Sequence, residues 1–160
     1  MSVEERWSTA IHEAGHVVVA WTFGLPVGAM EIGIDGDDTS GKSEIAETAS
    51  LTVVDRIALC AAGVQAERVF GRKILRDQSA FSDYAKIDAL LDDLPIEQAD
   101  GLQLRGHDRA FEILKLHRPM VERLAEHLTR TGRLGRKEVR SLLSLPIAAK
   151  PAPPPVGGQF

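Results

Sequence analysis

The run His12-Glu13-Ala14-Gly15-His16 places two histidines four residues apart, with a glutamate directly after the first. On a helix such a pair lies one turn apart, with about 5–6 Å between Cβ atoms, and both imidazoles can reach one zinc ion at about 2.0 Å. Glu13 then lies beside the metal, where it can take a proton from a zinc-bound water, as in the H-E-x-x-H motif. The motif has two free positions, so the alternative is two histidines on a solvated helix face.

A helix over Val3–Phe23 is predicted to carry this motif. Its apolar residues recur at helical spacing and form one stripe, made of Trp7, Ile11, Ala14, Val18 and Trp21. His12 and His16 fall on nearly the opposite side, so we do not expect them to be core histidines. Gly15 costs a helix interior about 1 kcal/mol relative to alanine. We therefore expect a neighbouring element to pack closely against it.

A small hairpin is predicted next. Residues 29–34 partly alternate in the manner of a strand, residues 35–41 are turn-forming, and residues 42–46 return as a second strand. An exposed edge of this hairpin would let an extended peptide add as a further strand. The predicted substrate strand is Glu31, Ile32, Gly33 and Ile34. The alternative is a plain surface ribbon.

A second helix, over residues 51–70, is apolar nearly all round. Such a helix is expected in the middle of the domain. Cys60 is interpreted as a small core residue, because no base or positively charged site lies near it in the sequence. Glu67 is an acidic residue near the end of a helix otherwise suited to the interior.

A third helix is predicted over residues 80–94. Its inward face is apolar and consists of Ala80, Tyr84, Ile87, Leu90, Leu91 and Leu94. Asp83 falls within this face. A carboxylate is costly to bury unless it is paired or binds a metal, so Asp83 is the best candidate for a third zinc ligand.

The C-terminal part is expected to be helical as well. Residues 95–106 are predicted as a connection, 107–129 as a helix that Pro119 breaks or kinks, and 136–143 as a last short helix. We expect His117 in the core or an interface, and His107 and His127 in solvent. The predicted fold class is mainly α with a small β-hairpin, in one domain over residues 1–145, followed by a disordered Pro-rich tail over residues 146–160.

Composition narrows the functional classes. The chain has 160 residues, of which 44% are apolar and 26% charged, as in an ordinary globular domain. It contains no apolar run long enough to span a membrane and no signal-peptide pattern. Its single cysteine suits a reducing compartment. We therefore expect the protein to be located in the cytoplasm. Residues 102–140 carry ten Lys/Arg against five Asp/Glu. Without interleaved aromatic residues or a recognition motif, nucleic-acid binding is not expected.

Four stretches, in order, resemble the peptidase domain of the FtsH-type ATP-dependent zinc metallopeptidases. They are T-A-I-H-E-A-G-H at residues 9–16, the hairpin with Gly41, D-R-I-A-L-C-A-A-G-V-Q-A-E-R-V-F-G at 55–71, and Q-S-A-F-S-D-Y at 78–84. The resemblance covers about residues 8–143 and implies a zincin-like helical peptidase fold. No Gly-rich phosphate-binding loop is visible, so we do not expect this chain to unfold substrates by itself.

The resemblance implies a zinc metalloendopeptidase that cleaves peptides, or proteins that are unfolded or delivered by a partner. It assigns His12, His16 and Asp83 as zinc ligands and Glu13 as the general base. Glu67 would hydrogen-bond a liganding imidazole, although it is also the rival third ligand, since many other zincins use a glutamate. A separate ATPase or adaptor and further copies of the chain are open as partners. The alternatives are a non-catalytic zinc-binding module of the same fold and a helical interaction domain without metal.

Overall fold

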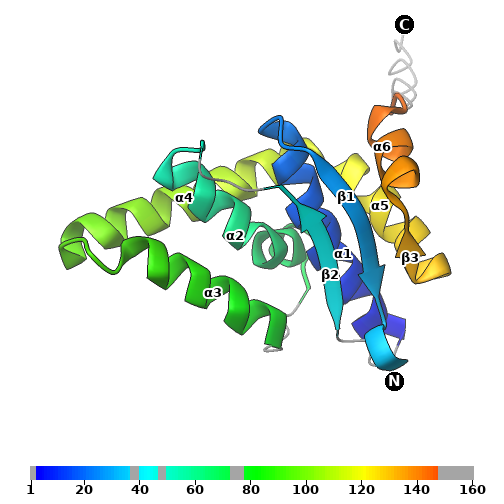
Figure 1. Ribbon diagram of the computed structural model, residues 1–160, viewed down its shortest axis with the longest axis horizontal. Coiled ribbons are helices and arrows are strands. Elements are labelled where there is room, and N and C mark those ends of the chain that lie inside the picture. Colours follow the sequence, from blue (N-terminus) through cyan, green and yellow to red (C-terminus); the bar gives the residue numbers. More distant parts are fainter. Residues whose placement is uncertain (1–2, 37–39, 47–49, 73–77, 148–160) are drawn as a thin grey trace, which may run out of the picture.

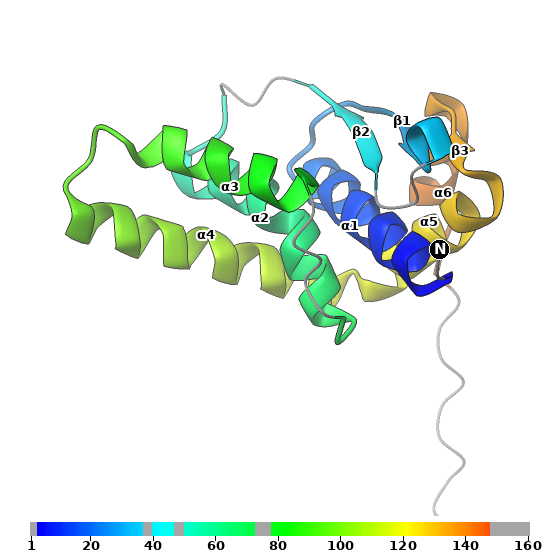
Figure 2. The same ribbon diagram turned by 90° about the horizontal axis from the view of Figure 1, so that it is seen from below.

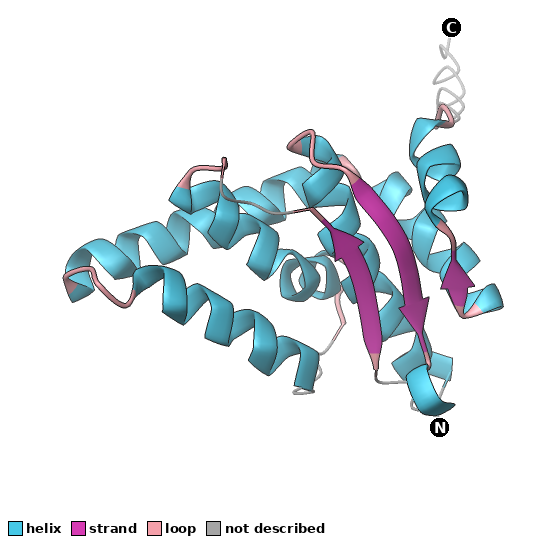
Figure 3. Cartoon of the chain, viewed as in Figure 1, coloured by secondary structure: helices cyan, strands magenta, loops and turns pink. Residues whose placement is uncertain are grey.

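The computed structural model describes residues 3–36, 40–46, 50–72 and 78–147. In chain order, these ranges contain α1 (Val3–Thr22), β1 (Val27–Ile32), a 3-10 helix (Ile34–Gly36), β2 (Gly41–Ile45), α2 (Val53–Val69), α3 (Gln78–Leu91), α4 (Ile96–Leu116), α5 (Arg118–Thr131), β3 (Arg133–Leu134) and α6 (Arg136–Ser144). The architecture is mainly helical with a small antiparallel sheet, which confirms the predicted class (Figure 1 and Figure 3). None of the helices in these ranges is both long enough and apolar enough to cross a membrane.

Helix α2 is the centre of the fold. It packs against α1, α3 and α4, and its residues from Ile57 to Glu67 are buried except for the half-buried Cys60. Figure 2 shows α2 lying between α1 and the pair formed by α3 and α4. The start of α2 is fixed by Thr52, whose hydroxyl accepts a hydrogen bond from the backbone N–H of Asp55. The prediction of a central buried helix is confirmed.

The crossing of α1 and α2 depends on Gly15. A Cβ atom at this position would lie 2.6 Å from both the Ala62 carbonyl oxygen and the Ala66 Cβ, so only glycine permits the observed helix separation. This confirms the expected close packing. The predicted one-sided apolar stripe is wrong, however: α1 is buried on all sides from residue 8 to residue 20, while Trp21 is 39% exposed. The reason is that α2, α5 and the sheet surround α1.

The sheet has the strand order β2-β1-β3, and both pairings are antiparallel. In β1, Glu31 pairs with Lys42 of β2 and with Arg133 of β3. The predicted substrate strand is therefore not an edge. Its Glu31 and Ile32 lie in the middle strand, and its Gly33 and Ile34 lie beyond the end of that strand. The edge strands are β2 and the two-residue β3. The two-residue strand β3 is too short to give a periodic signal in the sequence.

The predicted connection over residues 95–106 is wrong, because α4 begins at Ile96. Its two glycines suggested a loop. Gly106 instead lies where α4 crosses α2: a Cβ there would lie 2.6 Å from Ile57 Cβ, so the glycine serves close packing. The predicted break near Pro119 is confirmed, since α4 ends at Leu116 and α5 begins at Arg118.

Two of the remaining histidine predictions are also wrong. His107 and His127 are half-buried and not solvated: His107 Nδ1 accepts a hydrogen bond from Gln65 Nε2 (2.8 Å), and His127 Nδ1 donates to the Arg123 carbonyl (2.9 Å). Of the predicted tail, residues 148–160 lie outside the described ranges, as do residues 37–39 of the predicted turn. The tail's first residue, Pro146, accepts a hydrogen bond from Arg123 Nη2 at 3.0 Å.

Candidate metal centre

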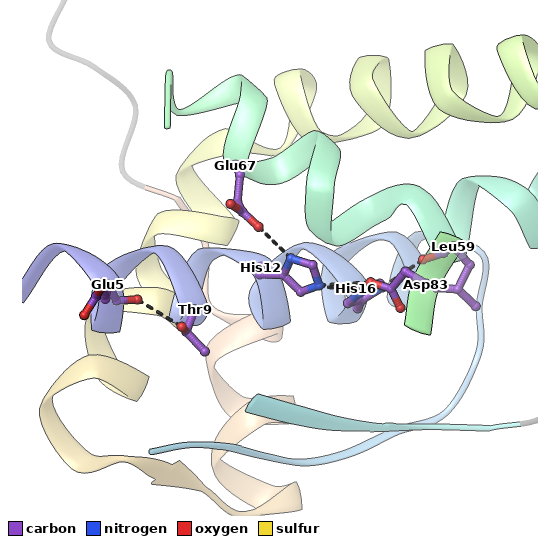
Figure 4. Close-up of polar contacts among 7 residues, drawn as sticks. All are labelled: Glu5, Thr9, His12, His16, Leu59, Glu67 and Asp83. Atoms are coloured by element: carbon purple, nitrogen blue, oxygen red, sulfur yellow. Dashed lines mark hydrogen bonds and ion pairs between the residues drawn. The ribbon is translucent and has the colours of Figure 1, made fainter. Parts of the chain in front are cut away.

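Two helices bring three metal-binding side chains together. His12 and His16 come from successive turns of α1, and Asp83 comes from the buried face of α3 (Figure 4). The two histidine Nε2 atoms are 3.3 Å apart, and Asp83 Oδ2 lies 3.0 Å from each of them. All three residues are less than 10% exposed. The structure therefore joins the three side chains that the sequence proposes as ligands.

The other nitrogen of each imidazole has a fixed role. His12 Nδ1 donates a hydrogen bond to Glu67 Oε1 (2.7 Å), and His16 Nδ1 donates to the Leu59 carbonyl oxygen (2.8 Å). A carboxylate or carbonyl oxygen can only accept, so the proton of each neutral ring is on Nδ1. Both Nε2 atoms then present lone pairs to each other and to an Asp83 oxygen, and such a cluster of acceptors requires a cation or an added proton.

The dimensions of the cluster suit zinc. In a tetrahedral site with ligand distances of about 2.0–2.1 Å, neighbouring ligand atoms are about 3.3 Å apart. The observed separations of 3.3, 3.0 and 3.0 Å are close to this spacing. Two imidazoles and one carboxylate also leave a fourth tetrahedral position open, which is typical of catalytic rather than structural zinc sites. The three residues therefore fit zinc in donor type and in spacing.

The electrostatics of the cluster favour positive charge. Burial by itself lowers the pKa of His12, but hydrogen bonds to Asp83 and Glu67 and the nearby Glu13 charge outweigh it and raise that pKa from 6.5 to about 10. Burial opposes ionisation of Asp83 too, yet its hydrogen bonds to the two histidines hold its pKa well below the ordinary value. Without a metal, a proton thus balances the cluster, and a bound cation would displace it.

Glu13 lies beside the cluster and not within it. It is buried on α1, and a Cβ at Gly41 of β2 would lie 2.7 Å from Glu13 Cγ, so this glycine makes room for the glutamate. Within the described ranges, no hydrogen bond engages the Glu13 carboxylate. The Glu13 charge acts on His12, and a carboxylate near the cluster without a structural hydrogen bond is suited to exchange protons.

Gly63 of α2 lies directly against the His12 ring of the cluster. A Cβ at this position would lie 2.5 Å from Cδ2 of the His12 ring and closer still to Nε2, so the ring rests directly on the helix backbone. The contact with Gly63 fixes the distance of the His12 imidazole from α2, and the hydrogen bond to Glu67, one turn further along α2, fixes the rotation of the ring. An isolated glycine inside an otherwise Ala-rich helix is the signal that could have identified Gly63 from the sequence.

Glu67 occupies the side of His12 away from the cluster. Glu67 accepts its hydrogen bond from His12 Nδ1, whereas His12 meets the other two members of the cluster through Nε2. Glu67 is therefore not among the converging atoms, whereas Asp83, the other candidate for a third ligand, is. The Leu59 carbonyl that fixes His16 is a backbone group, which no side-chain pattern reveals.

Comparisons with known proteins add no assignment. The sequence matches no protein-family model, and no curated protein matches it significantly.

Proposed function

We propose that this protein is a zinc-dependent metalloendopeptidase with a peptidase domain of the FtsH type. Its substrates would be peptides, or proteins that are unfolded or delivered by a partner. The observation that supports this best is the convergence of His12 Nε2, His16 Nε2 and Asp83 Oδ2, an arrangement that either a cation or an added proton must balance. Glu13, next to the cluster and free of structural hydrogen bonds within the described ranges, supplies the base that distinguishes a hydrolase from a metal-binding module.

The residues would divide the chemistry as follows. His12, His16 and Asp83 would hold zinc, which supplies Lewis-acid polarisation of the scissile carbonyl and activates water. Glu13 takes the proton of the attacking water and returns it to the leaving amine, so the glutamate ends the reaction as it began. Glu67 keeps the His12 ring in the tautomer and orientation that leave Nε2 free.

The open edge of β2 is the best place for an extended substrate. Strand β2 starts at Gly41, which lies against Glu13, and runs along α1. A peptide that adds to this edge uses the unpaired backbone groups of β2 for register. This replaces the substrate strand predicted from the sequence, which lies in the middle of the sheet.

The test uses zinc-loaded protein and an unfolded fluorogenic casein. We expect one zinc per chain by elemental analysis and cleavage that chelation abolishes. Glu13→Gln should retain the zinc and lose roughly 100-fold or more of the rate, because it removes the general base. Glu4→Gln, the same substitution at an exposed site on the same helix, is the matched control and should change neither property.

The outcomes separate the alternatives. Stoichiometric zinc with equal, negligible cleavage by wild type and Glu13→Gln would identify a non-catalytic zinc-binding module. Absence of zinc after metal loading, measured on folded protein, would refute the metal centre and the peptidase together.

A further inference from the structure

Arg56 of α2 has a buried guanidinium nitrogen, Nε, without a hydrogen-bond partner. The residue as a whole is half-buried. Within the described ranges, Arg56 forms no ion pair or hydrogen bond through its side chain. A buried donor without a partner is uncommon in folded proteins, because it gives up its bonds to water without replacement. A ligand that brings an acceptor would resolve this.

Arg56 lies on the face of α2 that carries the metal cluster. Residues 56, 60 and 63 are separated by four and three positions, so they follow one another along one side of the helix. The last of them, Gly63, supports the His12 ring, and the Leu59 carbonyl next to Cys60 holds His16. Arg56 is therefore about one turn beyond the cluster on the same surface, about 6 Å further along the axis than Cys60.

A second cation approaches from α3. Lys86 follows the buried Asp83 by three residues, so the two share one side of α3, and Lys86 is exposed. Helices α2 and α3 pack against each other, and the charges that act on Cys60 agree with this placement. Burial raises the pKa of the Cys60 thiol, the Asp83 charge raises it further, and the charges of Lys86 and Arg56 lower it. Two cations from neighbouring helices thus lie near one half-buried thiol beside the metal cluster.

The Asp83 carboxylate does not neutralise the charges of Arg56 and Lys86. Asp83 is bonded to His12 and His16 through Oδ2, and no ion pair within the described ranges joins it to Arg56 or Lys86. A guanidinium presents a planar set of donors that matches a carboxylate in bidentate fashion, and an ammonium adds a compact second charge. Among the groups that an unmodified peptide carries, a carboxylate is the anion that matches this pair of cations.

We propose that Arg56 and Lys86 form a carboxylate-binding subsite, and that the preferred substrates are peptides with a carboxylate a few residues from the scissile bond. This inference rests on the proposed peptidase function. The carboxylate is either an Asp or Glu side chain or the free C-terminus of the peptide, since both present the same group. The subsite lies on the α2–α3 side of the His12–His16–Asp83 cluster, so it selects among peptides without contributing to the bond cleavage itself.

The test compares four peptides of one sequence: Glu or Gln at a position on one side of the cleavage site, each with a free or an amidated C-terminus. We expect zinc-loaded wild type to favour a peptide with a carboxylate by roughly tenfold in kcat/KM over the Gln, amidated peptide. Comparing the amidated Glu peptide with the Gln peptide that has a free C-terminus shows which of the two carboxylates is recognised. Arg56→Gln and Lys86→Gln should each reduce this ratio towards one with the zinc content unchanged, whereas Lys115→Gln, on exposed α4 surface, should leave it unchanged.

Binding to Glu13→Gln protein, measured by fluorescence anisotropy with labelled peptides, separates the two proposals. Preferential binding of the carboxylate peptides without cleavage by wild type would refute the peptidase and retain the subsite. Cleavage with equal kcat/KM for all four peptides would refute the subsite and retain the peptidase, and neither binding preference nor cleavage would overturn both. If Arg56→Gln does not fold, the exposed Lys86→Gln still decides, because a preference that survives it contradicts the two-cation subsite.

Discussion

The contact between Gly63 and the His12 ring gives the sharpest prediction. Gly63→Ala would place a Cβ 2.5 Å from His12 Cδ2, whereas ordinary contact begins at 3.4 Å, so the ring must retreat by about 1 Å. Metal–ligand distances are held within about 0.2 Å, so Nε2 cannot keep its place in the cluster. Loss of a mere hydrogen-bond partner of a liganding histidine costs 10–100-fold in metal affinity. We therefore expect a loss of at least about 100-fold, or about 2.7 kcal/mol.

The measurement is a zinc titration of metal-free protein against a chromogenic chelator, with the visible spectrum of the cobalt-substituted protein as a report on coordination. Gly101→Ala is the matched control, because a Cβ at this position in α4 meets nothing within 4 Å. It should leave zinc affinity unchanged and raise the free energy of unfolding by about 0.5–1 kcal/mol through helix propensity. If folded Gly63→Ala protein binds zinc within threefold of wild type, the proposed position of His12 over α2 is wrong.

Three further predictions test the surroundings of the cluster. Glu67→Gln should lower zinc affinity by about 10–100-fold, measured in the same titration, because the His12 tautomer is no longer fixed by a carboxylate. Gly15→Ala should lower the free energy of unfolding in urea by about 1–3 kcal/mol, since its Cβ would lie 2.6 Å from atoms of α2; an unchanged midpoint would contradict the close crossing. In metal-free protein, the raised pKa of His12 contributes stability that is fully present below about pH 6.5 and is lost as the pH rises towards 10. Urea unfolding at pH 6 and pH 9 should show this decrease, and equal stabilities would refute it.

The convergence of His12, His16 and Asp83 could be predicted from the sequence because each of the three carries a local signal. The four-residue spacing of His12 and His16 places them on the same helix face, one turn apart. Asp83 is a charged residue within an otherwise apolar helix face. Gly15 is similarly recognisable, because a glycine that weakens a helix needs a packing reason. Each of these signals depends only on residues within one or two helical turns along the chain, so it can be read from the sequence.

What could not be predicted depends on contacts between distant segments. Gly106 has the same local signal as a loop glycine, and only its position against Ile57 of α2 explains why α4 continues through it. The place of β1 in the sheet depends on β3, more than 100 residues later, which pairs through two residues only. His107 pairs with Gln65 across two helices, so no local pattern distinguishes it from a solvated histidine.

The close crossing at Gly15 has a consequence for the choice of ion. Because Gly63 of α2 supports the His12 ring, the separation of α1 and α2 helps to fix where His12 Nε2 lies relative to Asp83 of α3. Calcium needs six to eight oxygen ligands at about 2.3–2.6 Å, and magnesium needs an octahedral shell of oxygens, so neither is satisfied by two nitrogens and one carboxylate at this spacing. A bulkier residue at position 15 would push α1 away from α2 and so displace the His12 ring from its contact with Gly63. In the proposed zinc site, the position of one ligand would thus depend on how two helices pack, and selection for one metal would act also on a residue that never touches it.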